Sequence, residues 1–231
     1  MPDRPYTLLS CAVSIDGYLD DGSPDRLILS GPEDLDEVDA LRAAADAILV
    51  GAGTIRADNP RLLVRDPARI AAREAAGKPP HPLRVTVTAT GELDPAARFF
   101  TGPGIPVVYC ASAAVAAAEE KFTGRGVVID AGAVLSLAAV LQDLHLERTV
   151  ATVLIEGGAR ILRDALAGGL ADELRLAIAP FFVADPSAPR FGLPAAYPQT
   201  PANPMTLTSL RQVGTVAVHH YRLGPNRPPR P

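Results

Sequence analysis

The chain has 231 residues, of which 48% are hydrophobic and 21% charged, and its formal net charge is −4 at pH 7. This composition is that of a soluble globular protein and excludes disorder along the whole chain. The length suits one large domain or two small ones, with a sizeable buried core. The acidic balance disfavours a nucleic-acid-binding surface, which needs a dense basic patch.

Membrane insertion and export are also disfavoured. No apolar run reaches the roughly 18 to 20 residues that span a bilayer, and the first residues carry a proline and an acid instead of a signal peptide's basic and apolar segments. We therefore expect a cytoplasmic protein. Cys11 and Cys110 lie inside apolar runs far apart in the sequence, which predicts two buried free thiols.

Short apolar runs alternate with helical patterns along the chain. The predicted strands are Tyr6–Val13, Ala47–Val50, Leu83–Thr88, Pro106–Cys110, Val127–Asp130, Val150–Ile155, Glu173–Val183 and Thr215–Leu223. The predicted helices are Pro32–Ala45, Asp66–Ala76, Ala113–Lys121, Val134–Leu144 and Ala159–Ala167. Continuous apolar strands that alternate with helices indicate an α/β fold, with a mostly parallel central sheet flanked by helices.

The C-terminal third has a different pattern. Only a proline-rich loop, Asp185–Pro204, separates the last two predicted strands, so we expect these strands to pair antiparallel at one edge of the sheet. Residues 1–223 are predicted to form a single domain. Residues 224–231 are predicted to form a disordered tail rich in proline and arginine.

One candidate binding motif runs from Leu154 to Leu162. It is a strand that ends in Glu156, followed by Gly157, Gly158 and a helix. Glycines let a ligand approach the backbone, and the helix start offers N–H groups and a positive dipole end. This pattern predicts an anion cradle suited to a pyrophosphate, although a plain strand-to-helix turn is the alternative.

A second motif runs from Ile48 to Arg65. A strand enters Gly51-x-Gly53, but Arg56 stands where a dinucleotide fingerprint needs its third glycine. The polar residues that follow suit a loop that holds a phosphorylated ligand, since arginine binds phosphate bidentately. A salt-bridged surface loop is the alternative. These polar residues are Thr54, Arg56, Asp58, Asn59, Arg61 and Arg65.

Several other chemistries lack their motifs. The sequence has no Gly-x-Ser-x-Gly elbow and no Walker P-loop. His145-Leu-Glu147 matches half of a zinc deaminase signature, but the Pro-Cys-x-x-Cys half is missing. We therefore predict no metal site. Ser14-Ile-Asp-Gly17 is a turn signal by itself.

Together these segments resemble the reductase domain of riboflavin biosynthesis, the RibD C-terminal domain family with its dihydrofolate-reductase-like fold. The resemblance extends from about Tyr6 to Leu223. It rests on the order and spacing of several short motifs. These are Ser14-Ile-Asp-Gly17, Ala47-Ile-Leu-Val-Gly-x-Gly-Thr54, Asp58-Asn-Pro60 with Arg65, Pro82-Leu-Arg-Val85, Ile155-Glu-Gly-Gly158 and Leu170-Ala-Asp-Glu-Leu174.

The resemblance implies an oxidoreductase, a pyrimidine reductase. It implies NADPH-dependent reduction of 5-amino-6-(5-phosphoribosylamino)uracil, or of its 2,5-diamino analogue, to the ribityl product. It also implies a small-molecule substrate and a homodimer, with no nucleic acid or membrane as partner.

The family's site residues carry over onto matching positions. Asp58 is the implied catalytic residue and also lines the cofactor pocket. The other implied cofactor-binding residues are Ala12, Thr54, Gly157, Gly158, Ala159, Arg160, Ile161 and Leu162. The implied substrate-binding residues are Arg42, Leu62, Arg65 and Glu156.

The sequence departs from the family pattern at three positions near the expected ligands. Tyr18 replaces a common basic residue, Leu27 a common aromatic residue, and Thr88 a common aspartate. Two alternatives therefore stay open: a reductase of the same fold that acts on another heterocycle, such as a pterin or dihydrofolate, and a non-catalytic nucleotide-binding module. The choice between NADPH and NADH is open as well. The leading hypothesis requires the turns at 51–58 and 156–160 to share one crevice.

Overall fold

The computed structural model describes residues 3–23 and 27–224, and their packing forms two compact units. One unit holds Asp39–Leu154 and the N-terminal residues up to Pro5. The other holds Tyr6–Val38 and the chain from Ile155 onward. The single domain expected over residues 1–223 stays a prediction. Apart from Gly224, the predicted tail lies outside the described residues.

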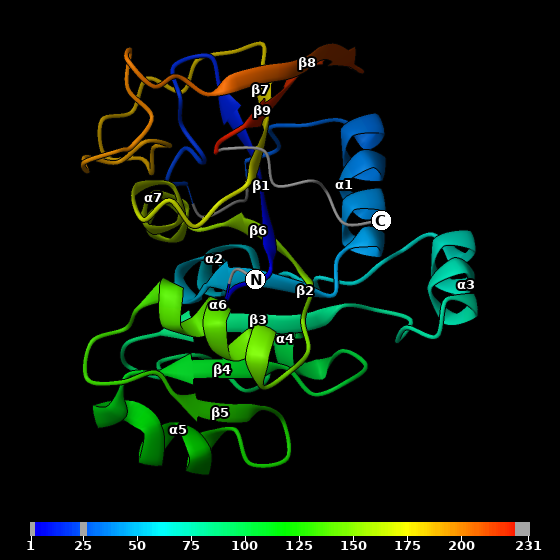
Figure 1. Cartoon of the computed structure of the whole chain (residues 1–231), viewed down its shortest axis with the longest axis vertical. Helices are drawn as coiled ribbons and strands as arrows, with labels where there is room; N and C mark the ends of the chain where they lie inside the picture. The colour runs from blue at the N-terminus through cyan, green and yellow to red at the C-terminus, as the bar shows by residue number, and fades with distance from the viewer. Residues whose placement is uncertain (1–2, 24–26, 225–231) are drawn as a thin grey trace. The chain divides into compact units, whose positions relative to one another are not determined.

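The first unit is built on parallel strands in the order β5-β4-β3-β2 (Figure 1). Every residue of β2 is buried, as are all residues of β4. Burial on both faces explains why these strands appear in the sequence as continuous apolar runs. Their bounds, close to the predicted ones, are β2 (Ala47–Gly51), β3 (Leu83–Thr88), β4 (Val107–Cys110) and β5 (Val127–Asp130).

Side-chain caps decide where two helices of this unit begin. Asp66 accepts hydrogen bonds from the backbone N–H of Ala68 and Arg69 and starts α3. Ser136 caps α6 by accepting a hydrogen bond from the backbone N–H of Ala139. Helix α6 therefore begins later than the predicted Val134. The helices of this unit are α2 (Ala52–Asp58), α3 (Pro67–Ala75), α4 (Arg98–Thr101), α5 (Val115–Lys121) after a 3-10 turn at Ser112–Ala114, and α6 (Leu137–Leu146).

The second unit contains strands in the order β1-β7-β9-β8. β1 (Tyr6–Ser14) pairs parallel with β7 (Glu173–Ala179), and β7 pairs antiparallel with β9 (Val216–Arg222). This confirms the antiparallel C-terminal edge. Strand β7 ends four residues before the predicted Val183 because Pro180 has no N–H to donate to a ladder.

One strand was not predicted. β8 (Thr206–Val213) pairs antiparallel with β9 and forms the edge, in a stretch without a predicted element. Most of its side chains are exposed, so its sequence carries no apolar run that would mark a strand. The small core of this sheet region combines Val213 of β8 with Ala177, Ala179, Val216 and Val218.

Two elements cross the boundary between the units. Helix α1 (Pro32–Ala44) belongs to the second unit up to Val38 and to the first unit from Asp39. Strand β6 (Thr152–Gly157) changes unit after Leu154. It leads into α7 (Ala159–Ala167), which matches its predicted bounds.

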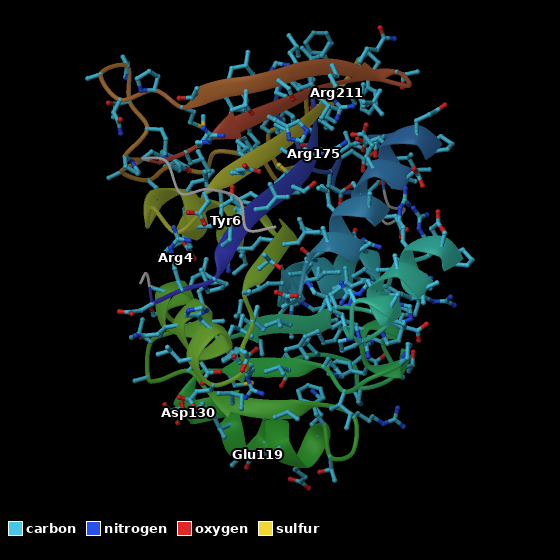
Figure 2. All side chains as sticks on the ribbon, turned by 45° about the vertical axis from the view of Figure 1, so that its right-hand side comes forward. Arg4, Tyr6, Glu119, Asp130, Arg175 and Arg211 are labelled. Atoms are coloured by element: carbon cyan, nitrogen blue, oxygen red, sulfur yellow. The ribbon has the colours of Figure 1, made fainter. Side chains whose placement is uncertain are left out.

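A buried charge network joins the first turns of α1 to the sheet of the second unit. Arg175 on β7, labelled in Figure 2, donates to the carboxylates of Asp34 and Glu37. Asp34 is only 2% exposed. Arg211 on β8 makes a bidentate contact with Glu37, at 2.9 and 3.2 Å. A buried charge is tolerated only when it is paired and hydrogen-bonded in this way.

Both cysteines are buried free thiols, as predicted, and burial raises the pKa of the Cys11 thiol to about 12. None of the helices in residues 3–23 and 27–224 has the length and apolar character needed to cross a membrane.

Candidate functional site

The stretch after β2 forms a short helix instead of the predicted polar loop. Gly51 adopts an extended conformation and starts α2, whose Ala52 and Ile55 are buried. The sequence hides this helix because Gly51 offers no capping side chain and Gly53 lies within its first turn. Burial of one face overrides these weak local preferences.

Helix α2 brings two predicted site residues together. Thr54 and Asp58 are four residues apart, so they lie on the same face of the helix. Both are half-buried, next to the fully buried face that holds Ile55. A hydroxyl and a carboxylate are therefore presented side by side at the carboxyl end of β2, the edge of an α/β sheet where ligands bind.

Two other members of the polar cluster have structural roles. Arg56 donates to the backbone carbonyl of Glu92 at 2.9 Å. Asn59 ends α2 in the left-handed conformation, with φ of 43°, and its side-chain oxygen accepts from the N–H of Arg98 at 2.7 Å. Two members of the polar cluster, Arg56 and Asn59, thus fix the backbone around α2.

The loop after α2 returns to helix α1. Leu62 has a φ of 54°, which is strained for a leucine, and its side chain is 2% exposed. Arg42 on α1 donates to the carbonyl of Leu63 at 3.3 Å. Leu62 is thus a core residue that anchors the loop, and the substrate contacts of Leu62 and Arg42 stay predictions.

Asp39 on α1 is a residue that sequence reasoning missed. Its carboxylate is 2% exposed and accepts from the backbone N–H groups of Arg65 and Asp66, and from the side chains of Arg65 and Arg69. Burial acts to raise the pKa of Asp39, but these hydrogen bonds outweigh it, so the pKa lies below its ordinary value. No sequence spacing marks it, because its partners Arg65 and Arg69 lie 26 and 30 residues away.

The predicted anion cradle is formed by two glycines and the start of α7. Gly157 and Gly158 have φ values of 147° and 90°, which favour residues without a Cβ. No side chain caps α7, and its first backbone hydrogen bond runs from the N–H of Leu162 to the carbonyl of Gly158. The N–H groups of Ala159, Arg160 and Ile161 therefore have no acceptor within the helix.

The remaining predicted residues of this unit differ in exposure. Glu156, the penultimate residue of β6, is half-buried, and Ala12 on β1 is half-buried opposite Ala177. Leu162 is a core side chain, 1% exposed. Arg160 is exposed, whereas the neighbouring Arg163 forms an ion pair with Asp164 at 2.6 Å.

The Ser14-Ile-Asp-Gly17 turn has a structural role. Asp16 accepts from the Ser14 hydroxyl at 2.5 Å and from the backbone N–H groups of Val183 and Ala184. Burial acts to raise the pKa of Asp16, yet these hydrogen bonds outweigh it and lower the pKa. The turn thereby ties together the loops that follow β1 and β7. Tyr18, one of the three expected departures from the family pattern, is buried, and the guanidinium carbon of Arg190 lies 4.7 Å from its ring centroid.

Comparison with known proteins identifies the family. Residues 5–218 match the RibD C-terminal domain. The chain belongs to this family.

Relatives in the RibD C-terminal domain family are named as reductases. The chain is 34% identical over 190 residues to 2,5-diamino-6-ribosylamino-4(3H)-pyrimidinone 5′-phosphate reductase of Archaeoglobus fulgidus, covering 80% of this chain and 85% of that one. It is 33% identical over 181 residues to the protein of the same name from Methanothermobacter thermautotrophicus, covering 78% and 80%. The riboflavin biosynthesis protein RibD of Chlamydia pneumoniae is 27% identical, and the match covers 91% of this chain but 55% of that protein.

Solved structures agree on the fold. A pyrimidine reductase-like protein from Corynebacterium diphtheriae superposes with a TM-score of 0.81 at 24% identity, covering 96% of this chain and 93% of that one. This confirms the predicted α/β, dihydrofolate-reductase-like fold.

The predicted site residues are divided between the two compact units. One unit holds Arg42, Thr54, Asp58, Leu62 and Arg65. Ala12, Glu156 and residues 157–162 belong to the other, and the crevice that they are expected to share stays a prediction.

Proposed function

We propose that this chain catalyses the NADPH-dependent reduction of 2,5-diamino-6-ribosylamino-4(3H)-pyrimidinone 5′-phosphate, or of the corresponding uracil, to the ribityl product. The observation that carries the proposal is the family match over residues 5–218, together with 34% identity to a reductase of that name. Because the names of these relatives do not state the cofactor, NADPH is the first part of the proposal to test.

The residues fit a dinucleotide. The backbone at Gly157 and Gly158 has no Cβ to block a ligand, and the uncapped N-terminus of α7 carries a partial positive charge suited to a pyrophosphate. Thr54 and Asp58 share one face of α2, which suits the nicotinamide side of the pocket. When bound, NADPH supplies the hydride, and the protein orients the reactants and excludes water.

Asp58 is proposed to move or hold the proton that ring opening of the ribose requires. Its half-buried carboxylate lies beside the hydroxyl of Thr54 on the same helix face. Asp58→Asn keeps the side-chain shape but removes the base, so we expect kcat to fall about 10²-fold or more with NADPH affinity retained. Turnover equal to the wild type would show that Asp58 is not catalytic.

Arg65 is proposed to bind the substrate phosphate. Its side chain is 57% exposed, and guanidinium groups recognise phosphate bidentately. We expect Arg65→Ala to raise KM for the phosphorylated substrate while leaving the Kd of NADPH unchanged. Equal weakening of both ligands, or no weakening, would count against this role.

The decisive assay mixes purified protein with NADPH or NADH and follows the absorbance of the reduced nicotinamide. The substrates are the two phosphoribosylaminopyrimidines, their dephosphorylated forms, and dihydrofolate. Oxidation of NADPH only with a phosphorylated pyrimidine supports the proposal. Oxidation with dihydrofolate alone supports the other heterocycle, and binding of NADPH without oxidation supports a non-catalytic module.

The family resemblance also implies a homodimer, which we propose for this chain. The edge strand β8 exposes Leu207 and Leu210, at 49% and 57%, and an exposed edge of this kind needs a cover. Sedimentation equilibrium of the full chain tests this directly. A monomer at all concentrations would overturn it.

A further inference from the structure

We propose that Asp39 is a positioning residue that sets the direction of the Arg65 guanidinium and thereby the recognition of the substrate phosphate. The inference rests on the proposed function, in which Arg65 meets that phosphate. Asp39 itself is buried and touches no ligand in this proposal.

The contacts bind Arg65 at two points. One carboxylate oxygen, Oδ1, accepts from the backbone N–H of Arg65 at 2.7 Å and from its side-chain Nε at 3.4 Å. The same carboxylate therefore fixes both the position of the Arg65 backbone and the direction of the Arg65 side chain. A contact at Nε orients the guanidinium plane, because Nε is part of that plane.

The other oxygen holds the carboxylate itself in place. Oδ2 accepts from the backbone N–H of Asp66 at 3.2 Å and from Nη1 of Arg69 at 3.1 Å. Arg69 is 24% exposed and belongs to α3, so this helix holds the oxygen that does not contact the Arg65 side chain. With four donors around two oxygens, Asp39 has little freedom to turn.

The difference in exposure between the two partners is what gives this pair a role in recognition. Asp39 is 2% exposed, whereas the Arg65 side chain is 57% exposed. An exposed arginine ordinarily samples many rotamers and loses that freedom on binding a ligand. A buried acceptor that orders Arg65 in advance reduces this loss, so it favours phosphate binding.

A purely structural role for Asp39 predicts something different. In that case the carboxylate would only anchor the 62–66 loop, and its removal would lower stability and affect all substrates alike. A third role, in which its negative charge competes with the phosphate for Arg65, predicts that removal of the charge tightens binding. Substrates with and without phosphate separate the three.

The experiment compares Asp39→Asn with the wild-type chain, using the proposed pyrimidinone substrate with and without its 5′-phosphate. Asparagine keeps the size but has one acceptor oxygen for four donors. We expect KM for the phosphorylated substrate to rise about tenfold, the effect of losing a hydrogen bond to a charged group. We expect kcat, KM for the dephosphorylated substrate and the Kd of NADPH to change less than about twofold.

Asp66→Asn is the matched control. Asp66 is the next residue, and its side chain caps α3 through Ala68 and Arg69. The same chemical change there lowers the melting temperature without changing the phosphate preference. In the Arg65→Ala background, Asp39→Asn should add nothing further to KM, because its effect passes through Arg65.

Two arms keep the test decisive. If Asp39→Asn does not fold, Arg65→Lys serves instead, since lysine keeps the charge but has no Nε–H for Asp39. It should lose the phosphate preference to a similar extent. The NMR signal of the Arg65 Nε–H, assigned with Arg65→Lys, reads the order of the guanidinium without any turnover. Asp39→Asn should weaken and broaden this signal, because an Nε–H without its acceptor exchanges faster with water.

The outcomes separate this inference from the proposed function. No oxidation of NADPH by wild-type protein with either pyrimidine would overturn the function, while the NMR arm still reads whether Asp39 orders Arg65. An unchanged Nε–H signal overturns the positioning role. So does an equal rise in KM for both substrates, or a lower KM for the phosphorylated one.

Discussion

Two acids of helix α1 each lie buried against an arginine, but the two arginines differ in exposure. Asp34 pairs with Arg175, whose side chain is 2% exposed, whereas Asp39 pairs with Arg65, whose side chain is 57% exposed. A pair with both members buried serves only the fold. A pair with one exposed member holds a charge at the surface in a defined direction, where a ligand can meet it.

The largest expected effect comes from breaking the fully buried pair. Arg175→Met leaves the Asp34 carboxylate buried without its main partner, so the free energy of unfolding should fall by about 3–5 kcal/mol. Denaturant unfolding measures this. Asp34→Asn added to Arg175→Met should recover much of the loss, because no uncompensated charge is then buried. A loss below about 1 kcal/mol for Arg175→Met would put this pair in the class of exposed ion pairs.

Lowering the pH should reduce the stability that the buried Asp39 carboxylate contributes. Its pKa is lowered in the folded state, so as pH falls the unfolded chain takes up the proton first. The stability that this carboxylate contributes is therefore present above its unfolded pKa, about 4, and is lost as pH falls through the folded value. Unfolding of wild type and Asp39→Asn from neutral pH to about pH 3 should show a difference in free energy that shrinks. A difference that is constant across this range would contradict the assigned pKa shift.

The smallest effect is expected at the exposed end of the buried network. Arg211 is 50% exposed and pairs with Glu37, so Arg211→Ala should lower the free energy of unfolding by less than about 1 kcal/mol. That loss should diminish at high salt, where exposed charges are screened. A loss as large as that of Arg175→Met would mean that exposure does not separate the two classes of arginine.

Much of this fold could be predicted because strands such as β2, β3 and β4 are almost fully buried and appear as continuous apolar runs. β3, β5 and α7 match their predicted bounds, since apolar runs and glycine stops mark them clearly. The missed elements carry no such signal. β8 is an exposed edge strand, and α2 starts at a glycine and is held by the burial of Ile55.

The site was predictable in part for a related reason. Gly157 and Gly158 stand out because the turn itself demands glycine. Asp39 is different, since its partners Arg65 and Arg69 lie 26 and 30 residues away. Only folding brings that carboxylate to the loop, so a sequence pattern has no spacing by which to mark it.

Two consecutive glycines with positive φ, Gly157 and Gly158, have a practical consequence for engineering. Any replacement there places a side chain on a left-handed backbone and lowers stability whatever the ligand. Libraries that probe the proposed coenzyme site should leave this pair fixed. Diversity is better directed to Arg160, whose exposed side chain can be exchanged without disturbing the main chain.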